Sequence, residues 1–444
     1  MDPVSRRTYY NKCHPLDTLD PGDERYVNID AIDPEHPVRG EDWVARLAGR
    51  IQLSDRPVYE LFTGLPGSGK STELRRLVQR LQANHGLLPV LIDGEEAIDL
   101  SNPIDVPDIY FAILYYTDAK VLELEGKSAA GAMQEGYLTR FWNWITTTDI
   151  NLKQAEFAVA DKAKLVVELK DRPSLRAQVR RSVAAHLPRF LEDAHDELRR
   201  LERRAIKLGF GGLVVIFDSL EKLRGTSTNW NEVMESAERI FGSGASYLRL
   251  PVHVLYTIPA ALTVRLRLDA VHFLPMIKLQ DRNGDRFEPG IDAAYMIATQ
   301  RVPMNALREI FGKESEARLE RLVAWSGGYP REIVRLLQLY LGTPMEKWPL
   351  SESDFERVLN QIADDYRKIV GTSAYEWLAR VAVQQYLVLE GDADREIADR
   401  LLQNNAVLRY LNDRDWFDIH PAVRQIPGVS EEIARQQDKP PLVQ

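Results

Sequence analysis

Short apolar runs alternate with segments of helical periodicity in the first quarter of the chain. Residues 58–63 form an apolar run, a glycine-rich turn follows, and residues 71–84 place leucines on one helical face. A second apolar run covers residues 87–93. Strand, helix and strand at this spacing predict a βαβ unit, and therefore a parallel sheet covered by helices.

Two further apolar runs, residues 213–218 and 252–257, predict central strands of the same sheet. The long stretch between the second and third predicted strands is mostly helical in pattern. It includes an apolar and aromatic helix at 109–124 and a charge-rich amphipathic helix at 174–207. Between these helices, residues 157–169 fit either a helix or a strand.

The regions on either side of this core differ in character. Residues 1–40 are rich in Asp, Pro and Gly and predict an extended lead-in, and residues 41–51 are helix-like. Residues 305–341 have a helical pattern that Gly327 and Gly328 interrupt.

The last quarter of the chain gives helices and then two short apolar strands, residues 407–412 and 416–419, separated by residues 413–415. Helices followed by a β-hairpin outline a winged-helix module. We expect the residues after 432 to fray.

The bulk composition narrows the class of protein. The 444 residues suggest about two to four domains, and an apolar share of 44% is ample for a packed core. The net charge of −9 excludes a generally basic nucleic-acid binder. Cys13 is the only cysteine, which excludes an intrachain disulfide and a multi-cysteine metal site and fits a reducing compartment. No apolar run approaches the ~18 residues that span a bilayer, and residues 1–13 carry no signal-peptide core, so we expect a cytoplasmic protein.

A phosphate-binding motif follows the first predicted strand. Residues 64–71 read Gly-Leu-Pro-Gly-Ser-Gly-Lys-Ser and fit the pattern G-x-x-x-x-G-K-[ST]. The glycines allow successive backbone N–H groups to point at phosphate oxygens, Lys70 supplies a cation to the β- and γ-phosphates, and the Ser71 hydroxyl ligates Mg²⁺. The positive dipole end of the next helix adds to this attraction. The predicted nucleotide-binding residues here are Gly64, Leu65, Pro66, Gly67, Ser68, Gly69, Lys70, Ser71 and Thr72.

Two carboxylates follow the third predicted strand. Asp218 ends a buried apolar run, which is the position of a Walker B acid that holds Mg²⁺ through water. Glu221 lies three residues later, where a carboxylate is placed to polarise the attacking water. The alternative for Glu221 is a surface acid at a helix start, paired with Lys222 or Arg224.

Two other junctions carry candidate nucleotide sensors. Thr257 ends the next predicted strand, where its hydroxyl either senses the γ-phosphate or satisfies its own backbone. In residues 326–331, Ser-Gly-Gly-Tyr-Pro-Arg, Pro330 suits the first turn of a helix from which Arg331 points toward the nucleotide. The alternative is an ordinary helix–turn–helix joint with a solvated arginine.

Two features have a plain structural alternative. His420 follows the last predicted strand, and a lone histidine is more often a structural donor than a ligand. The arginines of residues 174–207 interleave with acids, which favours a solvated face with i,i+4 ion pairs. An arginine supplied to a neighbour's phosphate and a DNA contact are the other interpretations of that face.

Taken in order, these motifs resemble those of the AAA+ and STAND groups of P-loop ATPases, which include origin-recognition-like, NACHT and NB-ARC proteins. The resemblance covers roughly residues 25–425. It implies an α/β fold, with a P-loop NTPase core built on a parallel sheet, a helical lid and a C-terminal winged-helix domain. The expected domains are a lead-in at 1–40, a core at 41–290 with a helical insert at about 105–207, a lid at 291–345, a winged-helix-like domain at 346–430 and a tail at 431–444.

The resemblance also implies roles for several residues. Pro330 would pack near the adenine and Arg331 would read the phosphates. Val38 and Arg39 lie in a stretch that resembles the lead-in lining the adenine pocket. His420 falls where STAND proteins place a winged-helix histidine that contacts ADP and locks the closed state.

The chain departs from the family pattern at its Walker B strand. Ser219 follows Asp218, where typical AAA+ enzymes have a glutamate. Glu221 instead matches the later acid of NACHT-type motifs, with Lys222 in place of the final acid. These departures predict slow ATP hydrolysis.

The resemblance implies an ATPase that acts as a regulatory switch with ATP or ADP and Mg²⁺ as cofactors. It implies a protein partner that acts as sensor or effector, and a homo-oligomer whose formation depends on the nucleotide. Such ATPases occur in bacterial defence systems, including antiviral ones, and the resemblance implies no association with a membrane. One alternative is a DNA-loading ATPase of the origin-recognition type. Residues 351–444 carry 17 acidic and 11 basic residues, so charge does not support DNA binding. A further alternative is a pseudo-ATPase scaffold that binds nucleotide without cleaving it.

Overall fold

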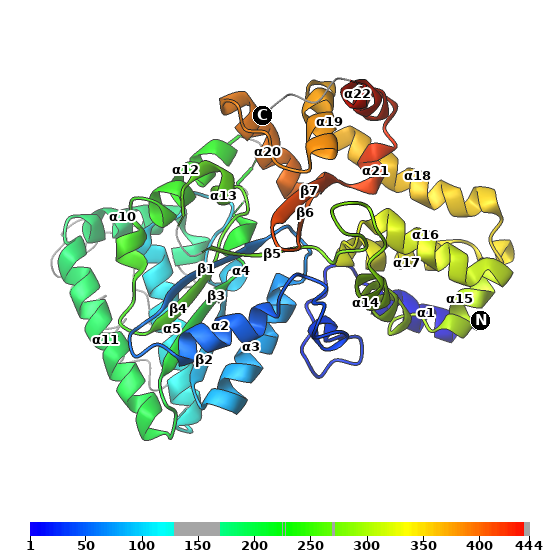
Figure 1. The fold of residues 1–444 in the computed structure, drawn as a ribbon. Coiled ribbons are helices and arrows are strands. Elements are labelled where there is room, and N and C mark those ends of the chain that lie inside the picture. The colour runs from blue at the N-terminus through cyan, green and yellow to red at the C-terminus, as the bar shows by residue number, and fades with distance from the viewer. Residues whose placement is uncertain (128–168, 224, 227, 269–270, 439–444) are drawn as a thin grey trace. The chain divides into compact units, whose positions relative to one another are not determined.

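The computed structural model describes residues 1–127, 169–223, 225–226, 228–268 and 271–438 (Figure 1). Residues 157–168, for which the sequence fits either helix or strand, lie outside this range. The chain forms two compact units, each assembled from separate segments. The first contains Met1–Arg46, Gly64–Arg75 and Phe273–Gln444, and the second contains Leu47–Thr63 and Arg76–His272. The glycine-rich motif therefore belongs to the first unit.

The predicted parallel sheet is confirmed. Its strand order is β2-β3-β4-β1-β5, and the pairs β2/β3, β3/β4 and β4/β1 are parallel. The strands are β1 (Tyr59–Gly64), β2 (Leu88–Asp93), β3 (Leu213–Asp218), β4 (His253–Thr257) and β5 (Val271–Leu274). Every residue of β3 is buried, as expected for a central strand between layers of helices.

The sequence pattern did not predict β5. This strand has four residues and contains His272, whose side chain is buried against Glu60 of β1 with 2.7 Å between Nε2 and Oε2. A buried acid–histidine pair breaks the apolar run by which a strand is recognised, although the two groups satisfy each other.

Helices of the second unit pack around the sheet. Helix α5 (Val106–Leu124) contacts β2, β3 and α11 (Leu187–Lys207), and it begins with a capping box at Asp105 and Asp108. The large side chains Phe217, Phe241 and Tyr256 are fully buried in one hydrophobic cluster. The described α-helices between the first and last strands are α3 (Lys70–His85), α4 (Gly94–Ala97), α5 (Val106–Leu124), α10 (Pro173–Ala184), α11 (Leu187–Lys207), α12 (Trp230–Phe241) and α13 (Leu262–Arg265).

The single helix expected at 174–207 is two helices, α10 and α11. Pro188 stands in the first turn of α11, where it lacks an N–H donor and restricts the residue before it, so the preceding helix cannot continue through it. Within α11, Arg199 pairs with Asp196 and Arg200 with Glu197, three residues earlier rather than at the expected i,i+4 spacing. Arg204 instead pairs with Asp118 of α5 and with Glu125 just after that helix, where all three side chains are partly buried.

The lead-in is not extended throughout. Residues Pro3–Lys12 form helix α1, because Asp2 caps its first turn by accepting hydrogen bonds from the N–H groups of Val4 and Ser5. Arg6 then donates to the carbonyls of Leu341 and Thr343 at 2.8 Å, which fastens α1 to the end of α17 (Pro330–Gly342). A short 3₁₀ turn, η1 (Ile29–Ala31), and helix α2 (Trp43–Gln52) follow.

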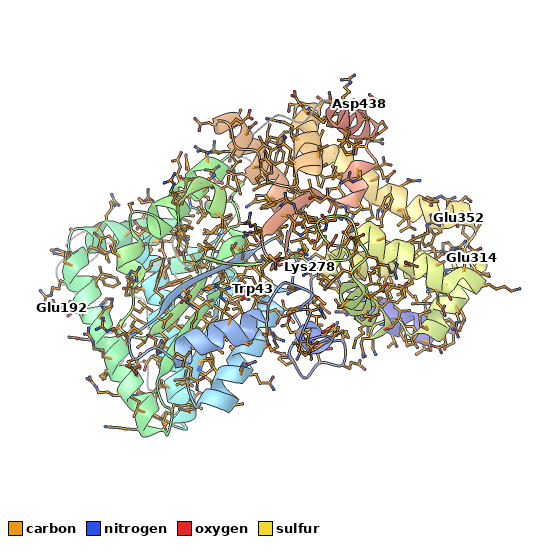
Figure 2. The ribbon with its side chains drawn as sticks, in the orientation of Figure 1. Trp43, Glu192, Lys278, Glu314, Glu352 and Asp438 are labelled. Carbon is orange, nitrogen blue, oxygen red and sulfur yellow. The ribbon has the colours of Figure 1, made fainter. Side chains whose placement is uncertain are left out.

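Four helices form the region expected to be the lid: α14 (Glu288–Thr299), α15 (Met304–Phe311), α16 (Ser315–Ser326) and α17 (Pro330–Gly342). Gly327 and Gly328 make the turn between α16 and α17 with φ values of +60° and +73°, and Pro330 begins α17 as predicted. Buried Arg318 bridges Glu314 and Glu352, both labelled in Figure 2, and so connects α16 to α18 (Glu352–Ile369).

The predicted β-hairpin is confirmed at β6 (Val407–Leu411) and β7 (Asp415–Ile419), which pair antiparallel after helices α19 (Tyr375–Gln384) and α20 (Asp392–Gln403). The rings of Tyr410 and Trp416, opposite each other in the hairpin, stack with centroids 4.4 Å apart.

Two helices follow the hairpin, α21 (Pro421–Arg424) and α22 (Pro427–Gln437). Whereas fraying is expected after residue 432, α22 continues to Gln437, because Val429 and Ile433, one helical turn apart, are both buried. Among the described helices, none has the length and apolar character required to cross a bilayer.

Candidate nucleotide-binding site

The glycine-rich turn has the backbone that an anion cradle requires. Gly67 and Gly69 have φ values of +77° and +101°, which a side chain would strain. A Cβ added to Gly64 would lie 2.9 Å from the Leu274 carbonyl oxygen, so that position also needs glycine. Lys70 is buried and donates from Nζ to the carbonyls of Gly64 and Leu65 at 3.0 and 3.2 Å, which places its ammonium over the turn.

The hydroxyl groups of the motif differ in their surroundings. Ser68 is fully buried, and its Oγ has no hydrogen-bond partner within the described part of the chain. Thr72 Oγ1 accepts a hydrogen bond from the N–H of Leu19 at 3.3 Å. Ser71 lies in the first turn of α3 beside Lys70. A buried polar group without a partner is costly, so Ser68 fits a cradle that receives a polar ligand.

Arg39 lies against this turn from the lead-in. Its side chain is buried, Nη2 donates to the Ser68 carbonyl oxygen at 2.5 Å, and Nη1 is 3.7 Å from Glu73 Oε1 on α3. Val38 is fully buried, and its carbonyl accepts from the N–H of Lys278 at 3.1 Å. The family resemblance implies that both residues lie near an adenine, and this stays a prediction. The structure brings Arg39 to the glycine-rich turn itself.

The first turn of α17 contacts the same motif. A Cβ at Gly67 would lie 2.6 Å from Arg331 Nε and 2.8 Å from the Tyr329 hydroxyl, so both side chains rest directly on the turn. Burial raises the pKa of Tyr329 to about 12, and it therefore stays a neutral donor. Arg331 thus lies against the glycine-rich turn, and its contact with a nucleotide stays a prediction. Tyr329 is a contact that sequence reasoning missed, although it stands inside the same motif.

Asn405 is a second contact that the sequence did not reveal. It precedes β6, has a φ of +54°, and donates from Nδ2 to the Pro66 carbonyl oxygen at 3.0 Å. Asparagine tolerates this left-handed conformation better than most residues. No motif marks Asn405, because its contact is with a residue 339 positions earlier in the chain.

His420 is fully buried next to these contacts. Its Nδ1 accepts from the N–H of Ala422 at 3.1 Å and thereby caps α21. The ring stacks on Tyr366 with centroids 4.4 Å apart and meets Tyr329 edge-on at 6.4 Å. Tyr329 therefore stands between His420 and Gly67. A structural capping role is visible, and the predicted contact with ADP stays a prediction.

The burial of His420 gives a testable pH dependence. Burial, followed by the charge of Arg335, lowers the pKa of His420 to about 3. The unfolded chain, with a histidine pKa of about 6.5, then binds a proton that the folded chain does not, so stability is complete above about pH 6.5 and is lost as pH falls. We expect His420→Asn, which keeps a capping acceptor, to flatten the fall of ~1.4 kcal/mol per pH unit between about pH 6 and 4, measured by urea unfolding. Identical slopes in the two proteins would contradict this.

In the second unit, the strand-end residues lie at one edge of the sheet, because β3 and β4 are parallel. Asp218 is buried, and its Oδ1 accepts from the N–H of Ser219 at 2.7 Å. Ser219 has a φ of +68°, a strained conformation for a residue other than glycine. The Thr257 hydroxyl accepts from the N–H of Leu220 at 3.0 Å and donates to the Phe217 carbonyl at 3.3 Å. It therefore satisfies backbone groups at the end of β3 rather than its own backbone, and sensing of a γ-phosphate stays a prediction.

Glu221 lies in the 3₁₀ turn η4 (Leu220–Lys222) just after Asp218. The ammonium of Lys222 pairs with Glu95 of α4. Arg224, the other cation considered as a partner of Glu221, lies outside the described residues. Glu221 thus stays a candidate for orienting water.

The strand order, the parallel pairing and the glycine-rich turn between β1 and α3 define an α/β P-loop nucleoside-triphosphatase fold, followed by helices and a winged-helix-like hairpin. No protein-family model and no curated protein matches the sequence. The assignment of the fold rests on this topology.

Among solved structures, the chain is similar to a Walker-type ATPase of Pyrococcus abyssi at 15% identity and a TM-score of 0.37, over 91% of this chain and 99% of that chain. It is also similar to the ORC2 protein of Aeropyrum pernix, described as ADPNP–ADP complexes, at 13% identity and a TM-score of 0.35, over 89% and 93% of the two chains. Cdc6p of Pyrobaculum aerophilum matches at 10% identity and a TM-score of 0.33, over 92% and 99%.

Proposed function

We propose that this chain binds ATP and ADP at residues 64–72, hydrolyses ATP slowly, and acts as a nucleotide-controlled regulatory switch. One observation carries the proposal. The phosphate-binding turn is held by side chains from three separate parts of the chain, Arg39 of the lead-in, Arg331 of the lid and Asn405 of the C-terminal module. A change in the conformation of the turn therefore alters contacts with all three parts.

The residues of the turn fit a polyphosphate. The backbone N–H groups of the glycine-rich segment and the start of α3 form a positive concavity, and the buried ammonium of Lys70 adds a full charge. Arg331 contributes a second cation beside Gly67. ATP would supply the phosphoryl group and Mg²⁺ would neutralise its charge. We propose Ser71 as a ligand of the ion. In the second unit we propose Asp218 as a Walker B acid and Glu221 as the residue that orients water.

Slow hydrolysis follows from the Walker B strand, where Ser219 occupies the usual glutamate position. We expect Glu221→Gln to reduce phosphate release at least ~100-fold while nucleotide affinity is kept, because a general base contributes about 10²–10⁴ in rate. Phosphate release is measured under single-turnover conditions with excess protein.

Glu95→Gln is the matched control for this experiment, since it removes a nearby carboxylate that pairs with Lys222. Its phosphate release should stay within about twofold of wild type. Undetectable release from the wild-type protein would instead identify a pseudo-ATPase scaffold.

A switch requires unequal affinities in its two states, because tight binding alone shifts no equilibrium. We propose that exchange of ADP for ATP changes self-association or binding to a protein partner. The mass of the purified protein, measured with ADP and with a non-hydrolysable ATP analogue, tests this. An identical mass with both nucleotides would remove the homo-oligomer from the proposal.

The alternative of a DNA-loading ATPase finds little support in the hairpin. Arg409 pairs with Asp415, and Arg424 pairs with Asp418 at 2.5 Å, so these cations are already neutralised locally. Phosphate neutralisation supplies most non-specific DNA affinity. Tight, salt-sensitive binding to duplex DNA at low ionic strength would favour this alternative.

A further inference from the structure

Two backbone carbonyls of the phosphate-binding turn are each held by one buried side chain. The Pro66 carbonyl accepts from Asn405 Nδ2 at 3.0 Å, and the Ser68 carbonyl accepts from Arg39 Nη2 at 2.5 Å. Both donors are almost completely buried, at 6% and 3% exposure. The two contacts are spaced two residues apart along the turn.

Because a peptide unit is planar, these two contacts also fix the direction of the next residue's N–H group. In a trans peptide the C=O of one residue and the N–H of the next point in opposite directions. Holding the Pro66 carbonyl outward therefore directs the Gly67 N–H to the other side of the turn. The Arg39 contact fixes the Gly69 N–H in the same way.

The N–H groups of Gly67 and Gly69 are the donors whose orientation is least fixed by the backbone itself. Gly67 and Gly69 both have positive φ values, and glycine passes between conformations more freely than other residues. Without an external contact, rotation of either peptide unit would turn an N–H away from a bound anion. Preorganised donors bind more tightly because less order is lost on binding.

We infer that Asn405 and Arg39 are positioning residues of the phosphate site, which orient the Gly67 and Gly69 N–H donors, and that the C-terminal module sets nucleotide affinity through Asn405. This inference rests on the proposed nucleotide binding. Asn405 suits the role because it combines an amide donor with tolerance of a left-handed backbone. Its Oδ1 is buried without a partner among the described residues, so the Pro66 contact is what its amide provides.

The test is the dissociation rate of a fluorescent ADP analogue, measured by stopped flow in the full chain. Asn405→Gly keeps the positive φ and removes the amide, and we expect dissociation to be about fivefold to tenfold faster, the value of one neutral hydrogen bond. Arg39→Lys loses the planar guanidinium and should be faster by about tenfold or more. With ATP, the KM of Asn405→Gly should rise while kcat stays the same.

Gln385→Gly is the matched control. Gln385 also has a positive φ, +59°, and its side chain makes two hydrogen bonds with Arg282 and none with the turn. Its ADP dissociation should equal that of wild type, and its thermal unfolding midpoint is measured beside that of Asn405→Gly. If Asn405→Gly does not fold, Asn405→Asp, which replaces the donor by an acceptor, carries the test and should also release ADP faster.

Wild-type dissociation rates in both Asn405 variants would overturn the inference and leave the proposed function intact. An equal acceleration in Gln385→Gly would also overturn it, because the effect would then be one of general stability. A wild-type protein that does not bind the analogue at all would reject the proposed function itself.

Discussion

Replacing Lys70 by alanine is expected to lower the affinity for both ADP and ATP by at least ~100-fold, which corresponds to ~2.7 kcal/mol. The ammonium is buried and lies over the turn, within 3.0 and 3.2 Å of the Gly64 and Leu65 carbonyls. A charge-assisted contact in such surroundings is among the strongest that a side chain makes with phosphate. Isothermal titration calorimetry with ADP and with a non-hydrolysable ATP analogue measures the change.

Lys347→Ala is the control for this prediction, because Lys347 is a half-exposed lysine that pairs with Asp354. It removes the same charge from the chain, and its nucleotide affinity should stay within about twofold of wild type. Retention of tight ADP binding by Lys70→Ala would show that the glycine-rich turn is not the nucleotide site.

The second large effect is expected from Gly328→Ala. A Cβ at this position would lie 1.9 Å from the Ile277 carbonyl oxygen, and the residue has a φ of +73°. Steric overlap with backbone adds to the strain of a left-handed alanine, so we expect a loss of ~3 kcal/mol or more in unfolding free energy. Nucleotide affinity should fall as well, because α17 and Arg331 begin just after this turn.

Gly284→Ala separates the two causes. Gly284 has a φ of +90°, but a Cβ there meets nothing within 4 Å. It therefore carries the conformational strain of about 1–2 kcal/mol without the overlap. Urea unfolding of both variants gives the comparison. Equal losses in the two proteins would show that the backbone at Ile277 yields to the added methyl group.

The elements with strong local signals were predictable from the sequence. The glycine-rich motif, β3 and the β6–β7 hairpin each carry a pattern that spans 13 residues or fewer, and the physical constraint behind each pattern is local. Pro330 at the start of α17 is another such case, since the ring of proline fixes the dihedral angle that a helix start requires.

Other features could not be foreseen because they depend on partners far away in the chain. Asn405 contributes to the site only through its contact with Pro66, and Tyr329 only through its contact with Gly67. The short strand β5 could not be recognised from its sequence, because the polar residue His272 is buried there only through its contact with Glu60. The prolines and acids of the lead-in predict loops, and helix α1 was therefore not foreseen. Asp2 and Pro3 are equally suited to begin a helix.

The assembly of the first unit from three separated segments has a consequence for the order in which binding competence appears during folding. Residues 64–75 leave the ribosome long before residues 273–438, yet they belong to the same compact unit. A nascent chain that has completed only its sheet holds the entire glycine-rich motif without Arg331 or Asn405 to shape it. Nucleotide that binds after synthesis would then stabilise the folded form of residues 273–438 by mass action. The nucleotide concentration would therefore influence how completely the newly made chain folds.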